Sequence, residues 1–105
     1  MPLYPPRRYS STSAPESGVN VLEHEMLAEM AASLGRAGER AKICLARLRE
    51  ASRESPDERV RLLKEAAAAV HAYFIQRELC GLRRHDDVIR DLQIPNQVLV
   101  RLGAA

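Results

Sequence analysis

The stretch Ser55-Pro56-Asp57-Glu58 separates two long runs of helix-forming residues. Serine caps helix N-termini, proline suits the first turn, and two carboxylates there meet the positive end of the helix dipole. The stretch therefore predicts that one helix ends just before Ser55 and that another begins directly after it. Because apolar residues recur at helical spacing on both sides, we expect the two helices to form an antiparallel hairpin.

The first predicted helix runs from Val19 to Arg53 and would be about 50 Å long at the helical rise per residue. Its apolar positions recur every three or four residues: Val19, Leu22, Met26, Met30, Leu34, Ala37, Ala41, Cys44, Leu45 and Leu48. One shorter helix cannot cover a stripe of this length. Acidic residues lie at the start of this helix and basic residues in its second half, an order that suits the helix dipole.

The second predicted helix continues from Pro56 until Gly81, which is expected to end it in a left-handed conformation. The same helical spacing places one set of apolar residues on a single face: Val60, Leu63, Ala67, Val70 and Phe74, widened by Leu62, Ala66, Ala69 and Tyr73. A chain that folds back at the turn then pairs residues whose numbers sum to about 110, given equal rise in both helices.

This register gives two glycines of the first helix a packing role. Gly35 and Gly38 each weaken a helix interior by about 0.8 to 1 kcal/mol relative to alanine, so their presence calls for close packing. In the predicted register Tyr73 and Phe74 face Gly35 and its neighbours, while His71 faces Gly38. We therefore expect small residues of the first helix to accommodate large residues of the second.

After the hairpin, two short helices are predicted, at about Arg84 to Leu92 and Asn96 to Leu102. The break falls at Ile94-Pro95, because proline disfavours a helical residue before it, and Gly103 closes the last helix. Their apolar contacts would come from Leu82, Val88, Ile89, Leu92, Ile94, Val98, Leu99 and Leu102. The predicted fold class is all-α: a long antiparallel hairpin whose open end these helices cap, completed by a dimer to a four-helix bundle.

The expected organisation is a flexible tail at residues 1–18 followed by one helical domain at residues 19–105. The tail is rich in proline and serine and has little apolar surface to offset its ordering entropy. Polar residues follow Arg7-Arg8, unlike the apolar run of a signal peptide, and charges interrupt every run that could span a membrane. We therefore expect a cytoplasmic protein with no membrane partner.

The two cysteines, Cys44 and Cys80, lack the spacing of a metal or redox motif. In the predicted register they lie roughly 20 Å apart along the hairpin, too far for a disulfide within one chain. Two reduced thiols are therefore expected. His24, His71 and His85 belong to different regions, so no metal or cofactor site is predicted.

One cluster of polar and aromatic residues near the end of the second helix is the candidate site. Its members are Tyr73, Gln76, Arg77, Glu78, Cys80, Arg83, Arg84 and His85. In one interpretation the cluster is a structural junction, in which Arg77 and Arg83 pair with Glu25 or Glu29 of the first helix. In the other interpretation it is a functional interaction surface.

The segment Gln76-Arg77-Glu78-Leu79-Cys80-Gly81-Leu82-Arg83, together with its surroundings from Ala66 to Gly103, resembles a group of short bacterial proteins of unknown function. The resemblance implies a small helical cytoplasmic protein and carries over no activity.

The function predicted from the residues is a non-enzymatic, self-associating helical protein, a homodimer that binds another protein. The alternative is a DNA-binding accessory protein that uses Arg83, Arg84 and the last two helices. A net charge of +2 is small for a polyanionic partner, and the last helix offers only Asn96, Gln97 and Arg101 as polar contacts. The third hypothesis is a small thiol enzyme at Cys80, with His71 or His85 as its base.

Overall fold

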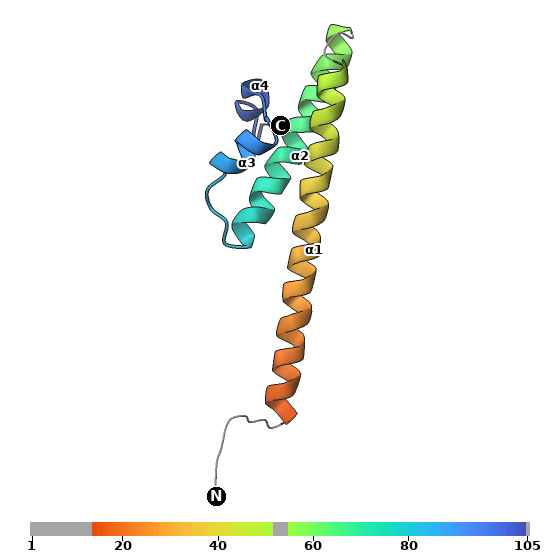
Figure 1. Ribbon diagram of the computed structural model, residues 1–105. Helices are drawn as coiled ribbons and strands as arrows, with labels where there is room; N and C mark the ends of the chain where they lie inside the picture. Colours follow the sequence, from red (N-terminus) through yellow and green to blue (C-terminus); the bar gives the residue numbers. More distant parts are fainter. Residues whose placement is uncertain (1–13, 52–54, 105) are drawn as a thin grey trace, which may run out of the picture. The chain divides into compact units, whose positions relative to one another are not determined.

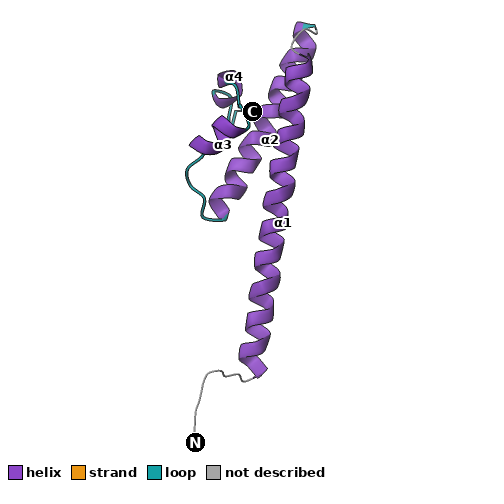
Figure 2. Ribbon diagram, viewed as in Figure 1, coloured by secondary structure: helices purple, strands orange, loops and turns teal. Residues whose placement is uncertain are grey.

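The computed structural model describes residues 14–51 and 55–104, with side chains from Gly18 onward. The described residues form helices joined by short loops and contain no strand (Figure 2). These helices are α1 (Ala14–Glu50), α2 (Pro56–Leu79), α3 (Asp86–Asp91) and α4 (Asn96–Leu99). The chain divides into two compact units, residues 1–31 and 32–105, and each is described by itself. The predicted all-α class and the helical hairpin are confirmed.

Helix α1 begins at Ala14, earlier than the predicted start at Val19. Pro15 falls in the first turn, where a backbone without an N–H loses no helical hydrogen bond, so the helix tolerates it. The helix ends at Glu50 rather than at Arg53, which lies outside the described residues. The part of the predicted tail that precedes Ala14 also lies outside them.

Helix α2 begins where the sequence predicts, with Ser55 as its N-cap. The Ser55 hydroxyl accepts a hydrogen bond from the backbone N–H of Glu58 at 3.3 Å, and Pro56 occupies the first turn. The Glu58 carboxylate does not reach back to the cap but binds the guanidinium of Arg61. This hydrogen bond lowers the pKa of the Glu58 carboxyl below its ordinary value.

The end of α2 is a Schellman motif around Gly81, as the prediction of a left-handed glycine requires. Gly81 has a φ of 88°, its N–H donates to the Glu78 carbonyl at 3.0 Å, and the N–H of Leu82 donates to the Arg77 carbonyl at 2.9 Å. The chain therefore reverses directly after Cys80 and returns toward α2.

The core of the unit 32–105 joins the second half of α1 to α2 and to the C-terminal segment (residues 82–104). Its three largest fully buried side chains come one from each part: Leu45 from α1, Val70 from α2 and Val98 from α4. Small residues such as Ala41 and Ala66 are also fully buried, so the helices approach closely. Val60, predicted on the buried face, is exposed instead, because it lies on the side of α2 turned to solvent.

The register of the hairpin is confirmed at Gly38. A Cβ placed on Gly38 would lie 3.1 Å from Cε1 of Tyr73, so the ring of Tyr73 packs on the glycine backbone. The other predicted neighbours are wrong. A Cβ on Gly35 would meet no atom within 4 Å, and the His71 ring lies beside Gly103, 3.5 Å from a Cβ there, instead of facing Gly38.

Phe74 also departs from the prediction, since its ring stacks on His85 of the C-terminal segment rather than facing Gly35. The helical spacing places residues 73 and 74 about 100° apart around α2. Only one of the two rings can therefore point at α1, and the other points at the C-terminal segment.

The C-terminal segment runs back along α2 and does not cap the open end of the hairpin (Figure 1). Near the start of α2, Nη2 of Arg59 donates to Oε1 of Gln97 at 2.6 Å. The two helices of the C-terminal segment are shorter than predicted. Residues 82–85 are non-helical, and tight turns follow Leu99. Leu82, predicted as a core contact, is exposed at the Gly81 turn. Gly103 closes the segment with a φ of 76°, as predicted.

Helix α3 ends in a second Schellman motif, which has a glutamine at the left-handed position. Gln93 has a φ of 52°, its N–H donates to the Arg90 carbonyl at 3.1 Å, and the N–H of Ile94 donates to the Ile89 carbonyl at 3.0 Å. A residue with a Cβ is strained by about 1 to 2 kcal/mol in this conformation, whereas glycine adopts it freely.

We expect Gln93→Gly to stabilise the protein by about 1 kcal/mol, because removal of this strain outweighs the greater freedom of glycine in the unfolded chain. Thermal or urea unfolding of the two proteins measures the change. Gln97→Gly, inside α4, is a contrasting variant and should destabilise, because it loses helix propensity and the hydrogen bond from Arg59. A Gln93→Gly protein no more stable than the parent would contradict the strain at this turn.

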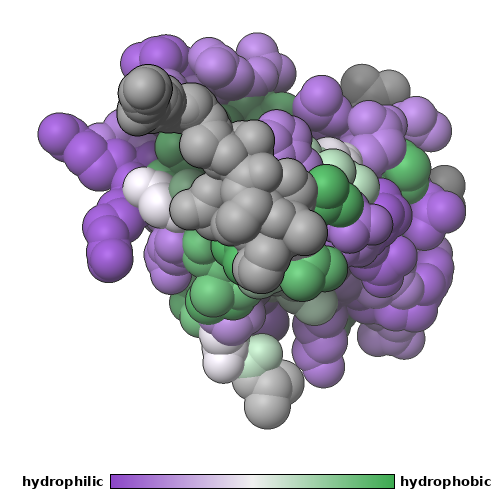
Figure 3. Space-filling view, turned by 90° about the horizontal axis from the view of Figure 1, so that it is seen from below, coloured by the Kyte–Doolittle hydropathy of each residue, from purple (hydrophilic) through white to green (hydrophobic). Residues whose placement is uncertain are grey.

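The described part of the unit 1–31 belongs to α1, and most of its apolar side chains are exposed. Val19, Leu22 and Met26 are 54%, 61% and 65% exposed, and they recur at helical spacing on one face. Hydrophobic residues are visible at the surface among hydrophilic ones in the space-filling view (Figure 3). None of the described helices is long and apolar enough to cross a membrane.

Candidate functional site

Arg77, near the end of α2, organises the candidate site. Its Nε donates to Nδ1 of His85 at 3.1 Å, and its Nη2 donates to the backbone carbonyl of Arg84 at 2.9 Å. Nη2 also lies 3.9 Å from Oδ1 of Asp87, and the guanidinium carbon lies 5.9 Å from the centre of the Tyr73 ring. The side chain is only 11% exposed, so these contacts hold a largely desolvated cation.

His85 joins α2 to the C-terminal segment through three of its contacts. Because the Nε of arginine can only donate, Nδ1 of His85 must accept, and the neutral ring then carries its proton on Nε2. Nε2 lies 3.0 Å from Oε2 of Glu78 and can donate to it. The ring also stacks on Phe74, with centroids 4.1 Å apart and planes inclined by 7°. Both nitrogens and one face of the imidazole are therefore occupied.

The groups that Arg77 binds within the unit 32–105 come from the C-terminal segment; its predicted pairing with Glu25 or Glu29, which belong to the unit 1–31, stays a prediction. The Schellman turn at Gly81 brings the backbone of Arg84 and His85 back over the last turns of α2, where the guanidinium reaches them. Arg77 binds these two residues at a small entropic cost of loop closure, because they lie only seven and eight residues further along the chain.

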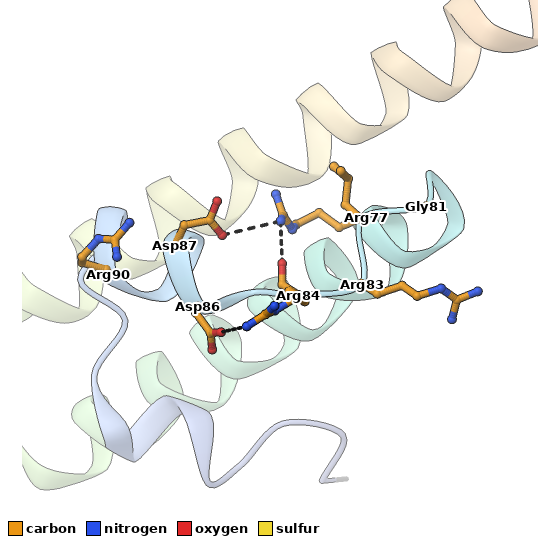
Figure 4. A pocket seen from close by; sticks show the side chains of 8 residues that line it. Arg77, Gly81, Arg83, Arg84, Asp86, Asp87 and Arg90 are labelled. Atoms are coloured by element: carbon orange, nitrogen blue, oxygen red, sulfur yellow. Dashed lines mark hydrogen bonds and ion pairs between the residues drawn. The ribbon is translucent and has the colours of Figure 1, made fainter.

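Arg83 and Arg84 differ from Arg77 in their surroundings. Arg83 points away from the cluster in the close view, and no hydrogen bond or ion pair joins its side chain to the other residues drawn there (Figure 4). The guanidinium of Arg84 lies 3.7 Å from Asp86, and both side chains are largely exposed. The predicted pairing of Arg83 with Glu25 or Glu29 of the unit 1–31 stays a prediction.

The remaining predicted members are backbone and packing elements of the junction. Cys80 is the half-buried C-cap of α2, and its N–H donates to the carbonyls of Gln76 and Arg77. Cys44 is buried in the core, and both thiols are free. The structure therefore gathers Tyr73, Arg77, Glu78 and His85 into contact, and leaves Gln76 and Cys80 to the helix end.

A shallow depression of about 610 Å³ opens beside this junction, between the end of α2 and α3 (Figure 4). Its lining is rich in charge: Arg77, Gly81, Leu82, Arg83, Arg84, Asp86, Asp87 and Arg90. The sequence prediction missed Asp87 and Phe74 as members of the junction. The acidic first turn of α3 offered a signal for Asp87, whereas no spacing rule foretells the stacking of Phe74 on His85.

The arrangement is suited to holding two chain segments together. Both nitrogens of His85 are engaged, so neither is available to activate the thiol of Cys80, and His71 is turned toward Gly103. Within residues 14–51 and 55–104, no group of three or more histidine, cysteine or acidic side chains is placed to hold a metal ion.

These features define a small all-α protein in which a helical hairpin is locked to a returning C-terminal segment by an arginine–histidine junction. The chain belongs to the family of unknown function DUF6665, whose model matches residues 9–105. The match confirms the resemblance to proteins of unknown function and extends it well before Ala66. No curated protein and no solved structure matches the chain.

Proposed function

We propose that this is a non-enzymatic, self-associating cytoplasmic protein that forms a homodimer of two hairpins and, as a dimer, binds another protein. One observation carries the proposal: the exposed apolar face of α1 at Val19, Leu22 and Met26. Side chains of this kind gain about 1.5 to 3 kcal/mol each when fully buried, and a continuous exposed face of them is typical of an interaction surface. Two free thiols suit a reducing compartment.

The charges of α1 favour a second copy as the occupant. Residues 19–35 carry Glu23, Glu25 and Glu29 and no lysine or arginine, whereas the following stretch, Arg36 to Arg49, is rich in basic residues. Two copies of this helix are therefore complementary in charge when they run antiparallel, and like charges oppose when they run parallel.

The dimer is tested by size-exclusion chromatography with light scattering at micromolar concentrations. We expect the parent chain to have twice the monomer mass, and the double variant Leu22→Ser/Met26→Ser to be monomeric with unchanged helix content. Ile43→Ser is the matched control, because Ile43 is also an exposed apolar residue of α1 but lies outside the stripe. A parent chain that stays monomeric at high micromolar concentration would refute self-association.

The partner protein requires a separate experiment. Affinity capture from the source cell with the parent chain, analysed by mass spectrometry, should recover a protein that the monomeric double variant does not. A thiol enzyme receives no support, since His85 is fully engaged, and a DNA-binding role receives none, since α4 spans only Asn96–Leu99 and Gln97 is bound to Arg59.

A further inference from the structure

Helix α2 has a second apolar stripe, which lies opposite its buried face. Ala68, Ala72, Ile75 and Leu79 recur every three or four residues, and Ile75 and Leu79 are 44% and 67% exposed. The buried face of α2 is shared between α1 and the C-terminal segment. The stripe is therefore a third side of α2, which nothing in the unit 32–105 covers.

Resting on the proposed homodimer, we infer that this stripe of α2 is the docking site for residues 19–30 of α1 from a second copy, running parallel to α2. The two stripes match in length and spacing. Val19, Leu22, Met26 and Met30 also recur every three or four residues. Each stripe spans about 16 Å at helical rise, so Val19 meets Ala68 at one end and Met30 meets Leu79 at the other.

The small residues of the α2 stripe permit close approach. Ala68 and Ala72 have little bulk, so the aliphatic side chains of Val19 and Leu22 can pack directly against the α2 backbone. A hollow of about 170 Å³ adjoins Ala68 and offers further room at this end of the stripe. At the other end Ile75 and Leu79 supply the bulk of the contact.

The charges around the stripe complement the acidic segment of α1. Lys64 and Arg101 line the hollow beside Ala68, and Arg83 follows Leu79. Of the carboxylates that flank the stripe, Glu65 pairs with Arg61, whereas Glu78 accepts a hydrogen bond from the neutral His85 ring and keeps its charge. A segment that contains glutamates and no lysine or arginine therefore meets basic side chains near both ends of the stripe, Lys64 and Arg101 beside Ala68 and Arg83 after Leu79.

Symmetry selects the parallel orientation. Because α1 and α2 are antiparallel within the hairpin, docking parallel to α2 sets the two α1 helices antiparallel. Two copies can then exchange identical contacts about a twofold axis, and the assembly closes as a dimer. If α1 of the second copy instead docked antiparallel to α2, the two α1 helices would be parallel and shifted along their axes. Each copy would then leave one docking site unfilled, and the assembly would be open-ended. In the closed dimer, α2 is surrounded on all three of its sides.

The experiment is disulfide trapping between two variants that each carry one introduced cysteine in a Cys80→Ser background, in which the remaining native thiol, Cys44, is buried in the core. A Val19→Cys chain is mixed with an Ala68→Cys chain in a glutathione redox buffer, and the covalent product is read by non-reducing electrophoresis and mass spectrometry. The matched control mixes the same Val19→Cys chain with Leu79→Cys, which lies about 16 Å further along the stripe, beyond the reach of a disulfide.

We expect a covalent heterodimer in the first mixture, at least ten times more abundant than in the second. A product in the second mixture alone, or self-linking of Val19→Cys, would overturn the inferred site. Light scattering on the same samples separates the two proposals. A dimer mass with no covalent product in either mixture would overturn the docking site and leave self-association standing. A monomer mass would refute self-association itself.

Discussion

Replacement of Arg77 by alanine is expected to lower the free energy of unfolding by about 2 to 4 kcal/mol. The change removes two hydrogen bonds from a charged donor, each worth about 1.5 to 3 kcal/mol, and leaves Nδ1 of His85 and the Arg84 carbonyl without their donor. For a domain of this size each kcal/mol corresponds to roughly 4 to 8 °C in Tm. Thermal unfolding followed by circular dichroism measures the loss.

Hydrogen exchange locates the same effect. In the Arg77→Ala protein, amide protection from residues 84 to 102 should fall more than protection within α2, because the junction ties this segment to the hairpin. Arg83→Ala is the control, since Arg83 points away from the cluster and should change neither measurement. Unchanged protection and an unaltered Tm in Arg77→Ala would show that the cluster is a functional surface instead of a structural junction.

Replacement of Gly38 by leucine is expected to cost about 1 to 3 kcal/mol through overpacking. Gly38 is buried, and a Cβ there would already lie 3.1 Å from the Tyr73 ring, so a longer side chain must displace the ring or separate the helices. The gain in helix propensity, at most about 1 kcal/mol, is smaller than this cost. Urea unfolding of the variant and the parent measures the difference.

Gly35→Leu is the matched control, one helical turn away. No atom lies within 4 Å of a Cβ at Gly35, so leucine there should gain helix propensity and stabilise by about 0.5 to 1 kcal/mol. We expect the free energy of unfolding to rise in Gly35→Leu and to fall in Gly38→Leu. Equal effects, or a Gly38→Leu protein as stable as the parent, would contradict the packing of Tyr73 on α1.

The two ends of α2 were predictable, because local chemistry decides them. The Ser55 cap and the left-handed Gly81 depend on backbone groups within one turn, and both occur where the sequence places them. The Schellman turn at Gln93 escaped prediction, since glutamine is a poor marker of positive φ. There the tertiary structure holds the residue in place, with Ile94 buried directly after it.

The candidate site was predictable in part of its membership, and the contacts of Arg77 with the C-terminal segment were not foreseen. Helical spacing correctly gathers Tyr73 and Arg77, because residues four apart share a face of α2. The partner of Arg77 depended on which neighbour the chain reversal brought within reach. A turn of a few residues after Cys80 places His85 beside the guanidinium, and this turn geometry is not expressed in the periodicity of the helices.

The sequence by itself determined the helical class, the turn at Ser55-Pro56 and the approximate hairpin register, because propensity, capping and apolar periodicity are short-range properties. Only the tertiary structure decided that the C-terminal segment returns along α2, that His85 stacks on Phe74, and that a stripe from Ala68 to Leu79 stays exposed within the described part of the unit 32–105. The physical reason is that a helix of this composition has more apolar sides than one partner can bury, and the choice among them depends on long-range packing.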